Sequence, residues 1–466
     1  MRQRLFLFFI LIIFALLFSC AHTSKWGKFL DWDEYTLESL PTQEDYPDAG
    51  AIILLDQADL EIFSSGELAY STLNRKMMVR ILNERGHKYT NVIVPYSENS
   101  EVSNIKARTI LPDGEIITLS DKEIYDITLY PDFIFYSDVR AKLFTMPAVE
   151  DGCVIEYSWT QTVRNFTYWT SWQFQHDEPT LIARYSVRCP SDWEINWKTY
   201  GVEIEPVVQA VPQGFKSTRK LEVRNLPPFI PEIGMPPGSN EIAHILFSPV
   251  GMSRWDQIGS WFYSLARERW VPHKKIRELA EELTKDAKTP KEKLRRIFEY
   301  VRDNIRYIAI EIGTGGYQPH FASSVLMNRY GDCKDMMTLI IALGRAVSLD
   351  VNPVIISTWY NGEVDTTIAS QAHFNHAIAL ATLPDSTEIW MDGTEKKCAF
   401  GELPWYDQNC IVMVIDKAGK TVLRRTPVVG ATENQSERVW EIKTDSQGNS
   451  TGKVTIGRRH RENCCF

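Results

Sequence analysis

The sequence has no excess of basic residues. Its 466 residues include 51 Lys and Arg against 60 Asp and Glu, which gives a formal net charge of −9 at pH 7. Proteins that bind nucleic acid neutralise phosphates with surplus basic side chains, and this chain offers no such surplus. General nucleic-acid binding is therefore excluded, and we expect no nucleic-acid partner.

The patterns of metal, redox and phosphate sites are also missing. None of the eight cysteines belongs to a CxxC pair, so neither a zinc knuckle nor a dithiol redox site is indicated. The glycine-rich stretch Gly313–Gly316 lacks the Lys-Ser/Thr that completes a phosphate loop, and we interpret it as a flexible segment. The sequence predicts neither a metal nor a cofactor.

The apolar run at the start of the chain is too short for a comfortable membrane span. It extends from Leu5 to Phe18 behind Arg2 and Arg4, in the order of the charged and apolar regions of an export signal. The following LFSC, which ends at Cys20, resembles the bacterial lipobox, whose cysteine carries lipid after cleavage.

We therefore expect a lipoprotein-type signal peptide over residues 1–19 and a lipid anchor on Cys20. The mature protein would be exported and held at a membrane, facing the periplasm or the cell surface. The alternative is an ordinary cleaved signal with an accidental cysteine at its end.

Export places the other seven cysteines in a compartment that favours disulfides. Seven is an odd number, so at least one thiol stays free or bonds outside the chain. A pair such as Cys398 with Cys410 is open on this basis. Cys333 is the candidate for the free thiol.

After a polar leader over residues 20–50, residues 51–225 show short apolar runs separated by turn residues. The clearest hairpin is RTILPDGEIITL, in which Pro112, Asp113 and Gly114 join two β-branched segments. Repeated units of this kind predict an all-β, sandwich-like domain.

Aromatic residues are dense near the end of this region, at Trp159, Tyr168, Trp169, Trp172 and Phe174. An exposed platform of this kind would bind a sugar or a peptide. Aromatic side chains favour half-buried pleated surfaces, so the interpretation as core and cross-strand pairs is preferred.

The composition changes at residues 226–272, which begin with the proline-rich stretch NLPPFIPEIGMPPGSN and are interpreted as a linker region. Residues 273–405 then show helical periodicity followed by a helix from Cys333 to about Val347 and three strands, which predicts an α+β domain. Residues 406–466 return to a strand pattern with too few hairpins for an independent domain. They are either a partial, truncated β-domain or an edge extension of the middle domain.

Cys333 follows Gly331 and Asp332, which have the pattern of a turn and a helix N-cap. A thiol acts as a nucleophile only as thiolate, and a helix N-terminus favours negative charge there. The helix carries an apolar stripe behind the cysteine, formed by Leu339, Ile340, Leu343 and Val347. The alternative is that Cys333 is a small buried hydrophobe, which is a common role for a lone cysteine.

The segment HFNHAIALATLPDSTEIWMDGTE favours the catalytic interpretation. His376 lies near the start of one predicted strand and Asp392 at the end of the next, and antiparallel pairing brings these two ends together. A histidine oriented by a carboxylate is the base that a catalytic thiol needs. His373 should point to the opposite face of the strand, so a His373/His376 metal pair is not expected.

These motifs, YGDCKD, FNHAIAL and WMDGT, resemble the transglutaminase-like superfamily in sequence and in the order Cys, His, Asp. The resemblance covers about residues 291–394. The β-rich region, through MPAVEDGCVIEYSW and WQFQHDEP, is similar to the uncharacterised all-β domain that often precedes this core in bacterial exported proteins.

The resemblance implies a papain-like fold in which Cys333 attacks an amide or acyl carbon, His376 transfers the proton and Asp392 orients the imidazole. It also implies an oxyanion donor upstream of the cysteine, for which Gln318 is a candidate and a plain loop residue the alternative. Asp332 and Asp335 are interpreted as helix caps.

The leading hypothesis is an exported, lipid-anchored cysteine-dependent acyl-transfer enzyme whose substrate is a protein or peptide, a cell-wall peptide included. Water and amines compete for the same thioester, so hydrolysis and transfer both stay open. The alternative is a non-catalytic module that binds a glycan or protein on a transglutaminase-like scaffold.

Overall fold

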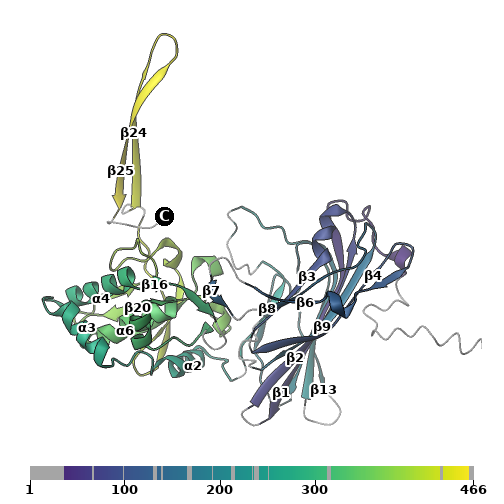
Figure 1. Cartoon of the computed structure of the whole chain (residues 1–466), viewed down its shortest axis with the longest axis horizontal. Helices are drawn as coiled ribbons and strands as arrows, with labels where there is room; N and C mark the ends of the chain where they lie inside the picture. Colours follow the sequence, from purple (N-terminus) through teal and green to yellow (C-terminus); the bar gives the residue numbers. More distant parts are fainter. Residues whose placement is uncertain are drawn as a thin grey trace, which may run out of the picture.

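The computed structural model divides into an N-terminal β-rich domain and a mixed α/β core (Figure 1). It describes residues 36–65, 68–97, 99–129, 134–137, 140–164, 171–191, 193–210, 216–233, 235, 241–249, 251–311, 316–430 and 434–460. The predicted signal peptide and Cys20 lie outside these residues. In the part of the chain that is described, no helix combines the length and the apolar character that crossing a membrane requires.

An eight-stranded sheet forms the centre of the β-rich domain, with strand order β13-β14-β11-β1-β2-β9-β4-β5. Its strands are β1 (Ala51–Ser65), β2 (Leu68–Ile81), β4 (Ser100–Ile110), β5 (Ile116–Thr118), β9 (Val154–Val163), β11 (Thr180–Pro190), β13 (Val207–Ala210) and β14 (Lys216–Leu226). The hairpin predicted around Pro112 is confirmed as β4 and β5. Gly114 closes its turn with φ of 90°, a conformation that glycine adopts without a steric penalty.

Two three-stranded sheets pack against this sheet and complete a sandwich-like core. They consist of β3 (Asn91–Tyr96), β8 (Arg140–Thr145) and β6 (Tyr125–Thr128), and of β10 (Ser171–Gln173), β15 (His244–Phe247) and β12 (Trp197–Tyr200). Trp159, Trp172 and Phe174 are buried between the layers, so their assignment to the core is confirmed. Tyr168 and Trp169 lie outside the described residues.

The α/β core has a five-stranded sheet with the order β21-β20-β19-β22-β23. Its elements are α2 (Trp255–Ala266), α3 (Lys274–Thr284), α4 (Pro290–Asn304), α5 (Ala322–Asn328), α6 (Cys333–Ala346), β19 (Asp350–Ile356), β20 (His376–Thr382), β21 (Glu388–Met391), β22 (Ile411–Ile415) and β23 (Thr421–Arg425). Helix α6 packs on β19 and β20 on one side and on α3, α4 and α5 on the other. Because it is enclosed in this way, α6 buries far more than the single predicted stripe.

The structure differs from the sequence interpretation on both sides of the core. The predicted linker region contains a strand, β15, and a helix, α2, since only its proline-rich beginning prevents regular structure. After residue 405, β22 and β23 join the five-stranded sheet of the core, so the edge-extension interpretation describes them. The hairpin of β24 (Asn434–Thr444) and β25 (Ser450–His460) projects away from the core (Figure 1).

The two domains contact each other on both sides of α6 along the chain. Strand β7 (Ile134–Ser137) of the β-rich domain pairs in parallel with β17 (Ala309–Glu311) of the core. On the other side, the Tyr200 hydroxyl donates to the Asp365 carboxylate at 2.9 Å, in the loop that leads to His376. The β-rich domain therefore supports the loops that flank the candidate site.

Candidate active site

Cys333 is the first residue of α6, directly after a paired helix cap. The Asp332 side chain accepts from the Asp335 backbone N–H at 3.2 Å, and the Asp335 side chain accepts from the Asp332 N–H at 3.2 Å. Both aspartates thus have the capping role that the sequence predicted. Gly331 is needed before them, because a Cβ there would lie 2.6 Å from the Cβ of Asp335. The half-buried thiol is held at the positive end of a rigid helix.

The same cap fixes the loop that precedes α5. Asp335 accepts from the His320 backbone N–H at 2.7 Å and lies 3.0 Å from His320 Nδ1. The hydrogen bond to Asp335 raises the pKa of His320 despite partial burial. The helix end and this loop therefore form one rigid wall beside the thiol.

Cys333 and His376 line the same cavity of about 310 Å³. Its other walls are largely apolar and come from α2, from the loop before α5 and from the strands of the sheet. They are formed by Ile258, Trp261, Phe262, Gly316, Tyr317, Lys334, Ile355, Gln371, Phe374, Asn375, Ala377 and Met413. Helix α2, which the sequence placed in a linker region, thus supplies one wall of the candidate site.

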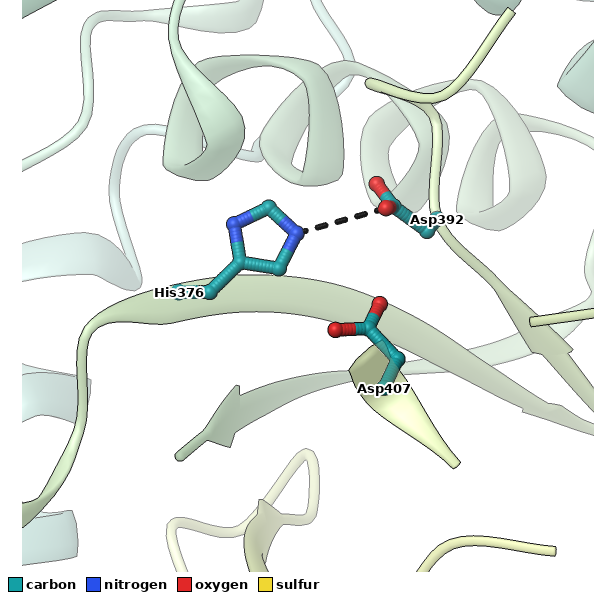
Figure 2. Close-up of side chains that lie close together, drawn as sticks. All are labelled: His376, Asp392 and Asp407. Carbon is teal, nitrogen blue, oxygen red and sulfur yellow. Dashed lines mark ion pairs between the residues drawn. The ribbon is translucent and has the colours of Figure 1, made fainter. Parts of the chain in front are cut away.

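His376 is the first residue of β20, and Asp392 directly follows β21, as the strand pattern predicted. His376 Nε2 lies 3.4 Å from Asp392 Oδ2 (Figure 2). The other oxygen of Asp392 accepts from the backbone N–H and the hydroxyl of Thr394 at 2.8 and 2.7 Å. The carboxylate is fully buried and is therefore fixed toward the imidazole.

The pKa shifts of His376 and Asp392 are those of an ion pair. Burial lowers the pKa of His376, but the Asp392 carboxylate and the Cys333 thiol outweigh it and hold that pKa well above its usual range. Burial raises the pKa of Asp392, but His376 and the Thr394 hydrogen bonds hold that pKa below its usual range. The buried imidazole of His376 is thus suited to the charged form, with the Asp392 carboxylate as the balancing charge.

Lys334 is a feature of the site that the sequence interpretation missed. Its side chain is buried, lines the cavity next to Cys333 and forms an ion pair with Asp332. Burial lowers the pKa of Lys334, but the charges of Asp332 and Cys333 outweigh it and the pKa is raised. The ammonium adds positive charge near the sulfur. Its position directly after the cysteine is the only signal that the sequence offers.

Asp407 is the second missed residue. It lies in the 3-10 helix η8 (Trp405–Asp407), beyond the predicted end of the catalytic domain, and its carboxyl group points toward His376 and Asp392 (Figure 2). One imidazole nitrogen of His376 and one carboxyl oxygen each of Asp392 and Asp407 lie within 4.8 Å of one another. Burial, together with neighbouring Asp392, raises the pKa of Asp407 to about 8, although His376 opposes the shift.

Other residues singled out in the sequence do not line this cavity. Gln318 Nε2 donates to the Leu265 carbonyl at 3.1 Å, and its side chain does not line the cavity. His373 lies in η7 (Gln371–His373), with Nε2 3.2 Å from the Ile368 carbonyl. Cys398 and Cys410 are both buried and no disulfide joins them, so the pairing left open by the sequence is absent.

Comparison with known proteins finds a family match in each of the two domains. The model of the transglutaminase-like superfamily matches residues 277–392, and a model of a domain of unknown function, DUF3857, matches residues 70–230. A comparison with curated proteins finds no match.

One similar solved structure supports this fold. The crystal structure of a protease candidate from Parabacteroides distasonis is similar over 85% of this chain and 77% of that chain, with a TM-score of 0.66 and 15% identity. A cysteine protease candidate from Cytophaga hutchinsonii matches 87% of this chain and 96% of its own at 12% identity. Its TM-score of 0.22 is too low to support a shared fold. The match to the transglutaminase-like superfamily thus covers the segment that carries Cys333, His376 and Asp392, and it follows the DUF3857 match in the same chain.

Proposed function

We propose that this protein is a cysteine-dependent enzyme that cleaves or transfers an amide of a peptide or protein. The observation that carries the proposal is the convergence of Cys333 and His376 on one cavity, with Asp392 buried behind the imidazole. A scaffold that only binds has no need for a thiol at a helix N-terminus next to a charged histidine.

In the proposed reaction, the Cys333 thiolate attacks the amide carbonyl carbon and forms a tetrahedral intermediate. His376 then gives its proton to the leaving amine, and a thioester remains on the sulfur. Water or a second amine, deprotonated by His376, attacks the thioester and frees the thiol. Asp392 keeps the imidazole oriented and stabilises its charged form throughout.

The cavity is lined mainly by apolar and aromatic side chains, which suits the side chain of a peptide substrate. The description of the Parabacteroides distasonis relative as a protease candidate agrees with peptide hydrolysis. Peptide, cell-wall stem peptide and primary-amine substrates, compared side by side, distinguish hydrolysis from transfer.

Alkylation of Cys333 by iodoacetamide tests the ion pair without knowledge of the substrate. We expect the wild type to react rapidly at pH 6.5, because His376 stabilises the thiolate. In His376→Ala the rate at this pH should fall by about 10–100-fold, since an ordinary thiol with a pKa near 8.5 is only about 1% ionised there. Mass spectrometry of the labelled peptide gives the rate at this residue.

His87→Ala is the control, because His87 is an exposed histidine that pairs with Asp151 in the β-rich domain and does not line the Cys333 cavity. It should leave the alkylation profile unchanged. Equal rates for the wild type and His376→Ala across pH 5.5–9 would argue against the enzyme and for a binding module.

We also propose that the mature protein is exported and tethered to a membrane by lipid on Cys20, facing the periplasm or the cell surface. The proposal rests on the charged and apolar regions before LFSC. Expressed in a bacterium with labelled palmitate, the wild type should carry the label and sediment with membranes. Cys20→Ala should lose both properties, and a labelled Cys20→Ala protein would contradict the assignment.

A second cavity supports the alternative function, a module that binds a glycan or peptide without catalysis. It has a volume of about 330 Å³ and lies between the β-rich domain and the segment before His376. Polar side chains from both domains line it, among them Gln173, His244, Asn361 and His373. A protein that binds a glycan or peptide there and shows no His376-dependent thiol reactivity would be such a module.

A further inference from the structure

Asp407 is a buried acid with no visible partner for its charge. Its side chain is fully buried, and in the described part of the chain neither carboxyl oxygen has a hydrogen-bond partner. Its backbone is well held, because its N–H donates to Pro404 at 3.0 Å and its carbonyl accepts from Thr426 Oγ1 at 2.6 Å. A buried carboxylate without donors is strongly unfavourable, so this group needs a proton.

The neighbouring carboxyl group explains where that proton belongs. Asp392 and Asp407 are too close in a buried site for both to be ionised. Asp392 is the better anion, since it receives two hydrogen bonds from Thr394 and faces His376. Asp407 receives none of these, and it is therefore the acid that stays protonated at neutral pH.

The groups around Asp407 support this assignment. His376 of β20 and Asp392 after β21 face it from the sheet (Figure 2). Tyr406 of its own 3-10 helix and Cys410 of the following turn are the other titratable groups near it, and the pKa of each is raised by burial and by the charge of neighbouring acids. At neutral pH, His376 is the only one of these four that carries a positive charge, and Asp392 already balances it.

We propose that Asp407 is a positioning residue: its protonated carboxyl group donates a hydrogen bond to Asp392 and holds the Asp392 carboxylate against His376. This role rests on the proposed function, because it matters only if His376 activates Cys333. Asp407 does not touch the substrate. It acts through Asp392 Oδ2, which lies 3.4 Å from His376 Nε2 and, among the described residues, has no hydrogen-bond donor of its own.

Two uncharged variants of similar size test whether the hydrogen-bond donor at position 407 is needed. Asp407→Asn keeps a neutral hydrogen-bond donor, and Asp407→Leu removes it while filling the space. We expect the Cys333 alkylation rate at pH 6.5 to stay within about threefold of the wild type in Asp407→Asn. It should fall about tenfold or more in Asp407→Leu.

Thermal unfolding tests whether Asp407 is protonated in the folded protein, independently of any enzymatic role. Burial raises the pKa of Asp407 in the folded state, so folding becomes less favourable as the pH rises from the unfolded value of about 3.9 to about 8. The Tm of Asp407→Asn minus that of the wild type should therefore increase between pH 5 and pH 8. Asp385→Asn, at an exposed turn of the same domain, is the matched control and should show no such increase.

The outcomes distinguish this proposal from the proposed function. The Tm difference between Asp407→Asn and the wild type could rise with pH while Cys333 is alkylated equally fast in the wild type and in His376→Ala. This result would support a protonated Asp407 and reject the proposed enzymatic function. Loss of reactivity in Asp407→Asn as large as in Asp407→Leu, or full reactivity in Asp407→Leu, would overturn the positioning role. So would a Zn²⁺-dependent rise in wild-type Tm that Asp407→Asn abolishes, because the three residues would then bind a metal.

Discussion

Replacing Cys333 by alanine is expected to abolish amide cleavage and transfer, with kcat/KM at least about 10³-fold below the wild type. Among the described residues Cys333 supplies the only thiol in the cavity wall, so no other described thiol can take over the attack on the carbonyl carbon. Substrate binding should survive, because the cavity walls are unchanged. The measurement is kcat/KM on the best peptide or amine substrate, with binding followed separately.

Cys410→Ala is the matched control for this variant. Burial and the charge of Asp407 raise the pKa of Cys410 to about 11, and its thiol donates to backbone carbonyls at 3.3 Å. This thiol stays neutral and outside the cavity, so its loss should leave kcat/KM within about threefold. An active Cys333→Ala protein would end the proposal of a covalent mechanism.

Asp392→Asn is expected to lower kcat by about 10²–10⁴-fold with little change in KM. The carboxylate outweighs burial and keeps the pKa of His376 high. With a neutral amide in its place, burial dominates and the imidazole loses its proton at lower pH. The thiolate–imidazolium pair should therefore disappear from the neutral range, and kcat measured from pH 5 to pH 9 records this change.

Glu388→Gln provides the control, because Glu388 begins the same strand β21 and pairs with Arg424 at the surface. Surface ion pairs contribute about 0–1 kcal/mol to stability, so this variant should fold and react as the wild type does. If Asp392→Asn retained wild-type kcat and pH dependence, Asp392 would have no role in orienting His376.

The sequence predicted residues whose local pattern carries their role. Cys333 follows an N-cap and opens an apolar helix, and the cap aspartates occupy the positions that capping requires. His376 and Asp392 stand at strand ends that a short turn must bring together. In these cases the relevant neighbours are close in sequence or are joined by a hairpin, so pattern and geometry coincide.

Asp407 shows the opposite case. It belongs to a short 3-10 helix beyond the last recognised motif, and nothing near it in sequence indicates that it meets His376. Helix α2 also lacked a signal, because it follows a proline-rich stretch and packs against β22 and β23, which lie far along the chain. Gln318 had the right sequence position for an oxyanion donor, but its amide is engaged by the Leu265 carbonyl.

The sequence by itself determined the two-domain order, the helix that presents Cys333 and the strand pair that carries His376 and Asp392, because each follows from local periodicity, capping or hairpin formation. Only the tertiary structure decided which distant segments form the walls of the cavity and which of the two acids, Asp392 or Asp407, carries a proton. Those features depend on packing between residues far apart in the chain, and on the burial of Asp407 beside Asp392, which no sequence pattern encodes.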